Sequence, residues 1–255
     1  MLKNIHIAII ALLIFAIACI FCAVSPGLSI CISFLLTSGF VAFNLFNIQR
    51  TLFIKSICSV KTDEKIVFLT FDDGPQQGTT ETILETLQAS NIQACFFCIG
   101  ERVEANPELV LKLYNAGHAI GVHTYSHKWQ DTLSSILVYE HNLHNCSNTL
   151  EKITGKKPML FRPPFAITNP NIASALKTLK LQSIGWNIRS FDTIIKDRNK
   201  LIDRITSRLK PGGIILMHDS LQITADILPE LIQKIHEKGY KILSLQQNID
   251  TEIYE

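Results

Sequence analysis

Short apolar runs alternate with longer amphipathic stretches from about residue 65 to the end of this 255-residue chain. The short runs suit buried strands, and the longer stretches suit helices that cover a sheet. We predict strands over 66–71, 93–99, 118–122, 159–162, 182–187, 213–217 and 240–244, and helices near 79–90, 107–116, 133–154, 171–180, 199–209 and 224–238. This order predicts an α/β protein with a parallel sheet, either an open doubly wound sheet or a barrel short of one unit.

Polar residues with catalytic potential follow most of the predicted strands. They are Asp72 and Asp73 after the first strand, His123 and His127 after the third, Arg162 after the fourth, Asp192 after the fifth and His218 after the sixth. The carboxyl ends of parallel strands meet at one end of a sheet, where α/β proteins build their sites. We therefore expect these side chains to converge on one site.

Three of these residues, Asp73, His123 and His127, have the chemistry of metal ligands. Hydrolysis by a bound metal needs a few ligands, an open position for water and a base that does not bind the ion, a role that suits Asp72. Two histidines four residues apart can reach one ion if the chain turns helical after the strand. Taken alone, the histidines are equally a chance surface pair, and Asp-Asp-Gly-Pro is equally an ordinary turn. Their combination favours a metal site.

Two further groups suit the hydrolysis of an amide. His218 titrates near neutrality, so it can protonate an amine leaving group on the side opposite the base. Arg162 can hold Asp72 by a forked hydrogen bond and fix its direction. A structural histidine and an ordinary surface arginine are the alternative readings.

A binding pocket for an acyl group is predicted next to these residues. Phe165 follows two prolines, and its backbone N–H lies in a stiff turn that suits the stabilisation of an oxyanion. Trp186 and Leu216 can line a pocket for an acyl methyl group, although residues of this type are more often plain core.

The first fifty residues contain two uncharged apolar runs, 5–24 and 28–48. Each has about the ~20 residues that a bilayer-spanning helix needs. We predict two transmembrane helices over 1–50, a linker over 51–64, a catalytic domain over 65–248 and a location at the cell membrane. A cleaved signal peptide and a lipid-modified Cys19 are the alternatives. Flanking positive charges favour cytoplasmic ends, but if only one run spans, the catalytic part lies outside.

The charge and the cysteine content of the chain exclude few classes of function. A formal net charge of +2 argues for neither nucleic acid nor an acidic polymer as partner, and we expect no nucleic-acid partner. Cys95 and Cys98 have C-x-x-C spacing, but they lie in an apolar run that is typical of a buried strand. We therefore interpret them as core thiols rather than a redox pair.

Four motifs, in this order, resemble those of the NodB-homology polysaccharide deacetylases, carbohydrate esterase family 4. They are Thr70-Phe71-Asp72-Asp73-Gly74, His123-Thr124-Tyr125-Ser126-His127, Arg162-Pro163-Pro164-Phe165 and Leu216-Met217-His218. The resemblance covers residues 65 to 245 approximately. It implies a distorted (β/α)7 barrel, a divalent metal that is usually zinc, and removal of N-acetyl or O-acetyl groups from sugars.

The resemblance also implies a role for each matching residue. The implied roles are base for Asp72, metal ligands for Asp73, His123 and His127, orientation of the base for Arg162, acid for His218, and an acetyl pocket for Trp186 and Leu216. One motif departs from the family pattern of Asp-x-x-Asp-Trp, because this chain has Arg189-Ser190-Phe191-Asp192-Thr193. Arg189 is expected to lower the pKa of His218 unless Asp192 or Asp219 pairs with that histidine.

The leading hypothesis is a membrane-attached, metal-dependent hydrolase that deacetylates a cell-envelope polysaccharide or its lipid-linked precursor. One alternative is a deformylase or deacylase of a lipid-linked sugar at the cytoplasmic face. Another is a non-catalytic sugar-binding homologue, which the Arg189 departure suggests.

Overall fold

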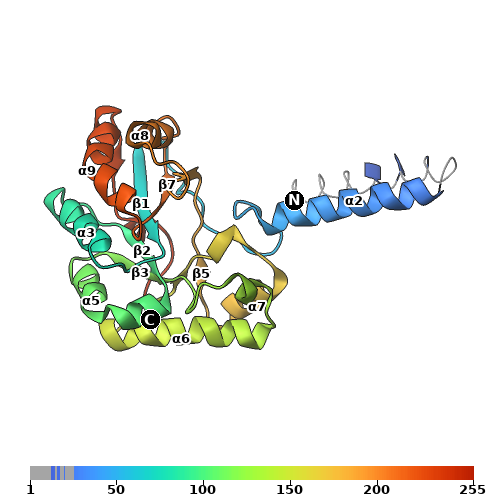
Figure 1. The fold of residues 1–255 in the computed structure, drawn as a ribbon, viewed down its shortest axis with the longest axis horizontal. Helices are drawn as coiled ribbons and strands as arrows, with labels where there is room; N and C mark the ends of the chain where they lie inside the picture. Colours follow the sequence, from blue (N-terminus) through green and yellow to red (C-terminus); the bar gives the residue numbers. More distant parts are fainter. Residues whose placement is uncertain (1–12, 15, 18–19, 21–25) are drawn as a thin grey trace. The chain divides into compact units, whose positions relative to one another are not determined.

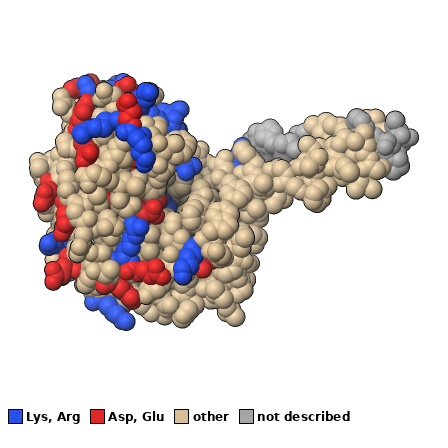
Figure 2. Space-filling view, viewed as in Figure 1, with Lys and Arg blue, Asp and Glu red and all other residues tan. Residues whose placement is uncertain are grey.

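The computed structural model describes residues 13–14, 16–17, 20 and 26–255. The chain divides into two compact units, Met1–Asn47 and Ile48–Glu255. In the first unit, the helix α2 (Pro26–Leu45) carries no Lys, Arg, Asp or Glu (Figures 1 and 2). On the visible face of the second unit, basic and acidic side chains are interspersed (Figure 2).

The predicted membrane anchor is not supported. Among the helices of the described residues, none combines the length and the apolar character that a bilayer crossing requires. Polar residues such as Ser33, Thr37 and Asn44 interrupt the apolar sequence of α2. This finding contradicts the predicted location at the cell membrane, and a membrane partner is not shown. The first apolar run, 5–24, lies mostly outside the described residues.

One parallel sheet of eight strands forms the centre of residues 48–255 (Figure 1). The strands are β1 (Ile66–Asp72), β2 (Cys95–Cys98), β3 (Ala119–Val122), β4 (Leu160–Phe161), β5 (Gln182–Ser183), β6 (Ile188–Arg189), β7 (Gly213–His218) and β8 (Lys241–Ile242). Their order is β5-β4-β3-β2-β1-β7-β6, and β8 pairs with the start of β1. The predicted barrel is thus confirmed in part, because the parallel sheet curls into a half-barrel but β5 and β6 do not pair.

Helices cover one face of this sheet. They are α3 (Thr79–Ala89), α4 (Gly100–Ala105), α5 (Pro107–Asn115), α6 (Ile136–Thr154), α7 (Pro170–Thr178), α8 (Arg198–Thr206) and α9 (Gln222–Glu237). All six predicted helices are present, and α4 is an additional short helix. The connections contain the 3-10 turns η1 (Trp129–Leu133), η2 (Pro164–Ala166) and η3 (Leu245–Gln247).

The strands are buried on both faces, and the two faces belong to different cores. In β1, Val67, Leu69 and Phe71 pack in the large cluster that includes the helices, whereas Ile66 and Phe68 pack in a smaller cluster on the inner face. Successive side chains of a strand point to opposite faces, so this alternation fixes which residues reach the inner face.

Residues 57–60, which belong to the predicted linker, lie between β5 and the start of β7. The Ile57 N–H donates to the carbonyl of Ser183 at 2.9 Å, and the Val60 N–H donates to the carbonyl of Gly212 at 2.9 Å. A Cβ atom at Gly212, where φ is 67°, would lie 1.9 Å from the Val60 carbonyl oxygen. Glycine is required for this close approach, and the segment fills the opening of the half-barrel.

The strand predicted over 182–187 is shorter than expected, because β5 covers only Gln182–Ser183 and the next strand, β6, begins at Ile188. Between them, the carbonyls of Ile184 and Gly185 accept hydrogen bonds from Nε and Nη2 of Arg162, at 3.1 and 3.0 Å. A buried side chain thus supplies the donors for these two carbonyls, while the Gly185 N–H donates to the carbonyl of Ile57 at 2.8 Å.

Candidate active site

The strand alternation delivers polar groups to the inner face at the carboxyl end of the sheet. Asp72 continues the inner-face series of β1, and His218 continues that of β7 after Ile214 and Leu216. A cavity of about 250 Å³ opens at this end of the sheet. The predicted site residues that line it are Asp72, Asp73, His123, His127, Phe165, Trp186, Leu216 and His218. The remaining two, Arg162 and Asp192, are fully buried beside it.

The three predicted metal ligands converge. The Oδ1 atom of Asp73 lies 3.4 Å from Nε2 of His123 and 3.3 Å from Nε2 of His127, and the three ligand atoms all lie within 4.8 Å of one another. A tetrahedral ion with bonds of about 2.0–2.1 Å places its ligand atoms roughly 3.3 Å apart. The spacing of the two nitrogens from this oxygen therefore fits a zinc-like ion.

The protonation of these groups also suits a cation. Nδ1 of His123 lies 2.8 Å from the carbonyl oxygen of Arg162. Because a carbonyl oxygen only accepts hydrogen bonds, the neutral ring carries its proton on Nδ1, and the lone pair of Nε2 is available to a metal. Burial lowers the pKa of His127 to about 4, so this ring is neutral at neutral pH. Burial opposes the charge of Asp73, but the hydrogen bond and charges of the histidines hold its pKa well below the usual range. His127 and Asp73 are thus in metal-binding forms, and the hydrogen bond at Nδ1 of His123 leaves its Nε2 as the atom that faces the other two ligands.

The loop that carries the two histidines is not the predicted helical turn. Thr124 and His127 have positive φ values of 67° and 52°, and the backbone reverses between them. The hydroxyl of Thr124 accepts from the His127 N–H at 3.2 Å, and the side chain of Asn142 on α6 accepts from the Tyr125 N–H at 2.7 Å. The rings therefore meet because the loop is held in a left-handed conformation, not because they share a helical face.

Asp72 is held by the buried Arg162. Nη1 of Arg162 donates to Oδ1 of Asp72 at 2.7 Å and to the hydroxyl of Thr70 at 2.8 Å. The guanidinium lies 4.2 Å from the centre of the Phe97 ring. The predicted forked bond is wrong, because the other donors of Arg162 bind backbone carbonyls. One oxygen of Asp72 is fixed, and Oδ2 lies 3.9 Å from Nε2 of His123.

His218 is paired with a buried carboxylate. Its Nδ1 lies 2.8 Å from Oδ1 of Asp192, and Oδ2 of Asp192 accepts from the His218 N–H and the Thr224 hydroxyl, both at 2.8 Å. Burial disfavours the charged imidazolium, but the hydrogen bond and charge of Asp192 outweigh it and raise the pKa of His218 to about 9. This histidine is therefore protonated at neutral pH.

Apolar and aromatic side chains form the rest of the wall. Trp186 and Leu216 are buried, at 7% and 3% exposure, whereas Phe165 is 44% exposed. The Phe165 ring lies 4.7 Å from that of His127 and 5.3 Å from that of Trp129. Phe165 has a φ of 58°, so its backbone makes a sharp turn at the cavity. The apolar floor and aromatic rim suit a small acyl group on a ring-shaped substrate.

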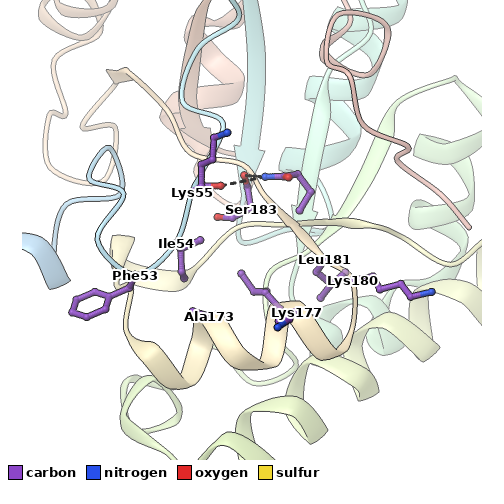
Figure 3. Close-up of a pocket in the computed structure, with 10 residues that line it drawn as sticks. Phe53, Ile54, Lys55, Ala173, Lys177, Lys180, Leu181 and Ser183 are labelled. Carbon is purple, nitrogen blue, oxygen red and sulfur yellow. Dashed lines mark hydrogen bonds between the residues drawn. The ribbon is translucent and has the colours of Figure 1, made fainter. Parts of the chain in front are cut away.

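A second cavity of about 290 Å³ lies elsewhere in this unit, between α7 and residues 53–55 (Figure 3). None of the predicted site residues lines it. Its polar atoms come mainly from Lys55, Lys177 and Lys180 and from the β5 strand. The metal-ligand and acid-base groups are thus gathered in the first cavity.

Comparisons with known proteins match this geometry to a family. The polysaccharide deacetylase family model matches residues 59–184. The chain is 33% identical over 191 residues to the peptidoglycan-N-acetylmuramic acid deacetylase PdaC of Bacillus subtilis, covering 74% of this chain and 40% of the relative. It is 32% identical to a peptidoglycan-N-acetylglucosamine deacetylase of Bacillus cereus, covering 74% of this chain and 90% of the relative.

The chain belongs to the polysaccharide deacetylase family. The crystal structure of the Bc1960 peptidoglycan N-acetylglucosamine deacetylase matches with a TM-score of 0.74 and 27% identity, over 78% of this chain and 95% of that one. The predicted family is confirmed, and the predicted barrel is confirmed in part, as a curled parallel half-barrel like that of this relative. The chain spans 40% of the length of PdaC.

The departure at Arg189 does not leave His218 unpaired in this deacetylase-family chain, because Asp192 provides one of the two pairings that were expected to offset it. Asp192 pairs with His218, and the pKa of His218 is raised rather than lowered. Asp219 does not take part in this pairing, because it lies elsewhere and accepts from the Thr80 hydroxyl at 2.7 Å. Asp192 alone is therefore the partner of the histidine.

Several supporting residues of the deacetylase-family site were not predicted. Thr70 accepts from Arg162, and Thr224 and Ser190 donate to the Asp192 carboxylate. Arg102 donates to the carbonyl of Asp73 at 2.6 Å. A threonine within the apolar run of β1 is the one signal in the sequence that points to such a role, because a buried hydroxyl needs a partner.

Proposed function

We propose that this chain is a metal-dependent hydrolase that removes N-acetyl groups from the amino sugars of a cell-envelope glycan. The observation that carries the proposal is the meeting of a His-His-Asp ligand set with a separately held carboxylate, Asp72, and a protonated histidine, His218, around one cavity. The names of the relatives support an N-acetylated peptidoglycan as the substrate.

Asp73, His123 and His127 would hold a divalent cation, for which zinc is the proposed identity. Two imidazole nitrogens and one carboxylate oxygen at the observed spacing leave a fourth position open, as catalytic zinc sites do. When bound, such an ion supplies Lewis-acid polarisation of a carbonyl and makes a water molecule more acidic.

Asp72 is the proposed general base. Arg162 holds one of its oxygens, so the other is directed towards the side where His123 lies. A carboxylate in this position can take a proton from the attacking water. Arg162 acts as a positioning residue, because each of its three guanidinium nitrogens donates to a protein group.

His218 is the proposed general acid. It enters the reaction as an imidazolium that Asp192 stabilises, and it donates the Nε2 proton to the amine as the carbon–nitrogen bond breaks. Nδ1 is occupied by the carboxylate, so only Nε2 faces the substrate. Asp192 is a positioning residue for the histidine.

The acyl group is proposed to lie on the apolar floor of the cavity. Trp186 and Leu216 would contact its methyl group, and the Phe165 N–H would donate to the carbonyl oxygen as negative charge develops there. A larger acyl group would have to displace buried side chains, which favours acetyl.

The test is acetate release from peptidoglycan fragments and from oligomers of N-acetylglucosamine, with zinc added. A lipid-linked N-acetylated sugar, the alternative substrate predicted from the sequence, is assayed beside them. Loss of the base should lower kcat by about 10²–10⁴ in Asp72→Asn. Asp63→Asn, which changes an exposed carboxylate, is the matched control. Acetate release by Asp72→Asn at the rate of the unchanged protein would contradict the role of Asp72.

A further inference from the structure

Arg189 is a cationic residue at the cavity that the proposed reaction does not use. It ends β6, and its Cα atom is in register with that of Leu216 on β7. Side chains at paired positions of neighbouring strands project from the same face of a sheet. Both residues accordingly line the cavity, but Leu216 is buried in the floor whereas Arg189 is exposed. The guanidinium thus belongs to the mouth of the site.

The guanidinium is held by an aromatic ring. It lies 4.6 Å from the centre of the Phe191 ring, and Arg204 lies 4.1 Å from the centre of the same ring. Phe191 has a positive φ of 63°, which reverses the chain directly after β6. This packing restricts the Arg189 side chain without neutralising its charge.

The charge of Arg189 is not matched by a protein carboxylate. In the part of the chain that the structure describes, Arg162 and Arg198 form ion pairs with Asp72 and Asp226, but no carboxylate lies at ion-pair distance from Arg189. Asp192, the nearest acid in the sequence, is occupied by His218. A planar cation at a cavity mouth, free to form two parallel hydrogen bonds, suits a carboxylate ligand.

The acetamido group of a substrate is neutral, so it does not account for this cation. Under the proposed function the acyl group would lie deeper in the cavity, at the buried Trp186 and Leu216, so the group that would meet Arg189 is a substituent of the sugar itself or of its neighbour. We infer that Arg189 selects N-acetylated amino sugars that carry a carboxylate close to the acetamido group, as a 3-O-lactyl ether does. This inference rests on the proposed function.

The experiment compares two probes that differ only in charge. One is a disaccharide of N-acetylglucosamine and N-acetylmuramic acid with a free lactyl carboxylate, and the other is the same disaccharide with that group converted to a carboxamide. Dissociation constants are measured by calorimetry in the zinc-loaded Asp72→Asn protein, which keeps the probes intact. Acetate release from both probes is measured in the protein with Asp72.

The acid should bind about tenfold more tightly than the amide, because a charge-assisted pair is lost in the amide. Arg189→Gln in the same background should reduce this ratio to near one. Arg204→Gln is the matched control, because it removes the other guanidinium from the Phe191 ring but does not line the cavity, and it should retain the ratio.

The outcomes separate this inference from the proposed function. Equal affinity for the acid and the amide, or an unchanged ratio in Arg189→Gln, would overturn the role of Arg189 even if both probes release acetate. Tighter binding of the acid that depends on Arg189, without acetate release from either probe, would support that role and overturn the proposed hydrolysis.

Discussion

The carboxylate of Asp192 lies 2.8 Å from Nδ1 of His218 and is itself fully buried. It also accepts hydrogen bonds from the backbone of the same histidine and from Thr224. The ring is therefore fixed in orientation, and the charge of the carboxylate favours its protonated form.

Asp192→Asn should move the alkaline limit of activity to lower pH. The pKa of His218 is raised to about 9, so the acid is charged at neutral pH and is lost as the pH rises through that value. Without the carboxylate of Asp192, burial lowers the pKa of the ring and the charges of Asp72 and Asp73 still oppose it, so the pKa should fall from about 9 towards lower values. The pH profile of kcat/KM measures this shift. If kcat/KM of the variant still declines only near pH 9, Asp192 does not determine the pKa of the alkaline side of the profile.

The same pair should contribute to stability in a defined pH range. Because the folded-state pKa is raised, its contribution is fully present below about pH 6.5 and is lost as the pH rises towards 9. Urea unfolding of the metal-free protein at pH 6 and pH 9.5 checks this. The difference between unchanged protein and Asp192→Asn should be larger at pH 6.

Arg162→Lys should lower both stability and turnover. A lysine keeps the charge, but it cannot donate hydrogen bonds to Thr70, Asp72 and two backbone carbonyls at once. Buried acceptors left without a donor cost about 1–3 kcal/mol each, so we expect a loss of about 3 kcal/mol in the free energy of unfolding. Arg198→Lys, at an exposed ion pair, is the control and should change little. Equal stability of the two variants would contradict this account of Arg162.

His127→Gln should weaken zinc binding by about 100-fold or more, because it removes one of three protein ligands. Competition with a coloured chelator measures the affinity. His144→Gln, which changes an exposed histidine on α6, should bind zinc as the unchanged protein does. Chelation of the metal should abolish acetate release, and added zinc should restore it. Undiminished zinc affinity in His127→Gln would place the metal elsewhere.

Gly74→Ala should disturb the loop that carries Asp73. A Cβ atom at Gly74 would lie 1.9 Å from Oδ2 of Asp219, a buried side chain that accepts from Thr80. Either the loop or Asp219 must shift, at a cost of about 1–3 kcal/mol, and zinc affinity should fall with stability. Gly39→Ala, where nothing lies within 4 Å of the added atom, is the control for the substitution itself. A Gly74→Ala protein with unchanged melting temperature and zinc affinity would contradict the close approach.

Local sequence patterns were sufficient to predict most of the sheet and the end of it at which the candidate site residues gather. Apolar runs predict strands because they are buried on both faces, and helix termini follow from Pro107, Pro170 and the glycine after α6, all of which lie at helix ends. The alternation along β1 and β7 also places Asp72 and His218 on one face. These features depend on neighbours in the sequence.

Features that depend on distant contacts could not be predicted in this way. The histidine loop takes its shape from left-handed residues and from Asn142 on a later helix. The interruption after β5 arises because Arg162, about twenty residues earlier, binds the backbone there. The apolar N-terminal runs predict membrane helices by composition, but the described part of α2 does not meet that requirement.

The position of residues 57–60 between β5 and β7 affects how the chain can be shortened. A truncated form that starts at residue 65, directly before β1, would lose the backbone partners of Ser183 and Gly212 and expose Ile184, which Ile57 pairs with. Ile48 is buried against this region as well. Fragments for crystallisation or assay should therefore retain the chain from residue 48 onwards. A fragment that begins later would leave backbone groups beside β5 and β7 without partners, and these groups could pair with a second copy of the chain.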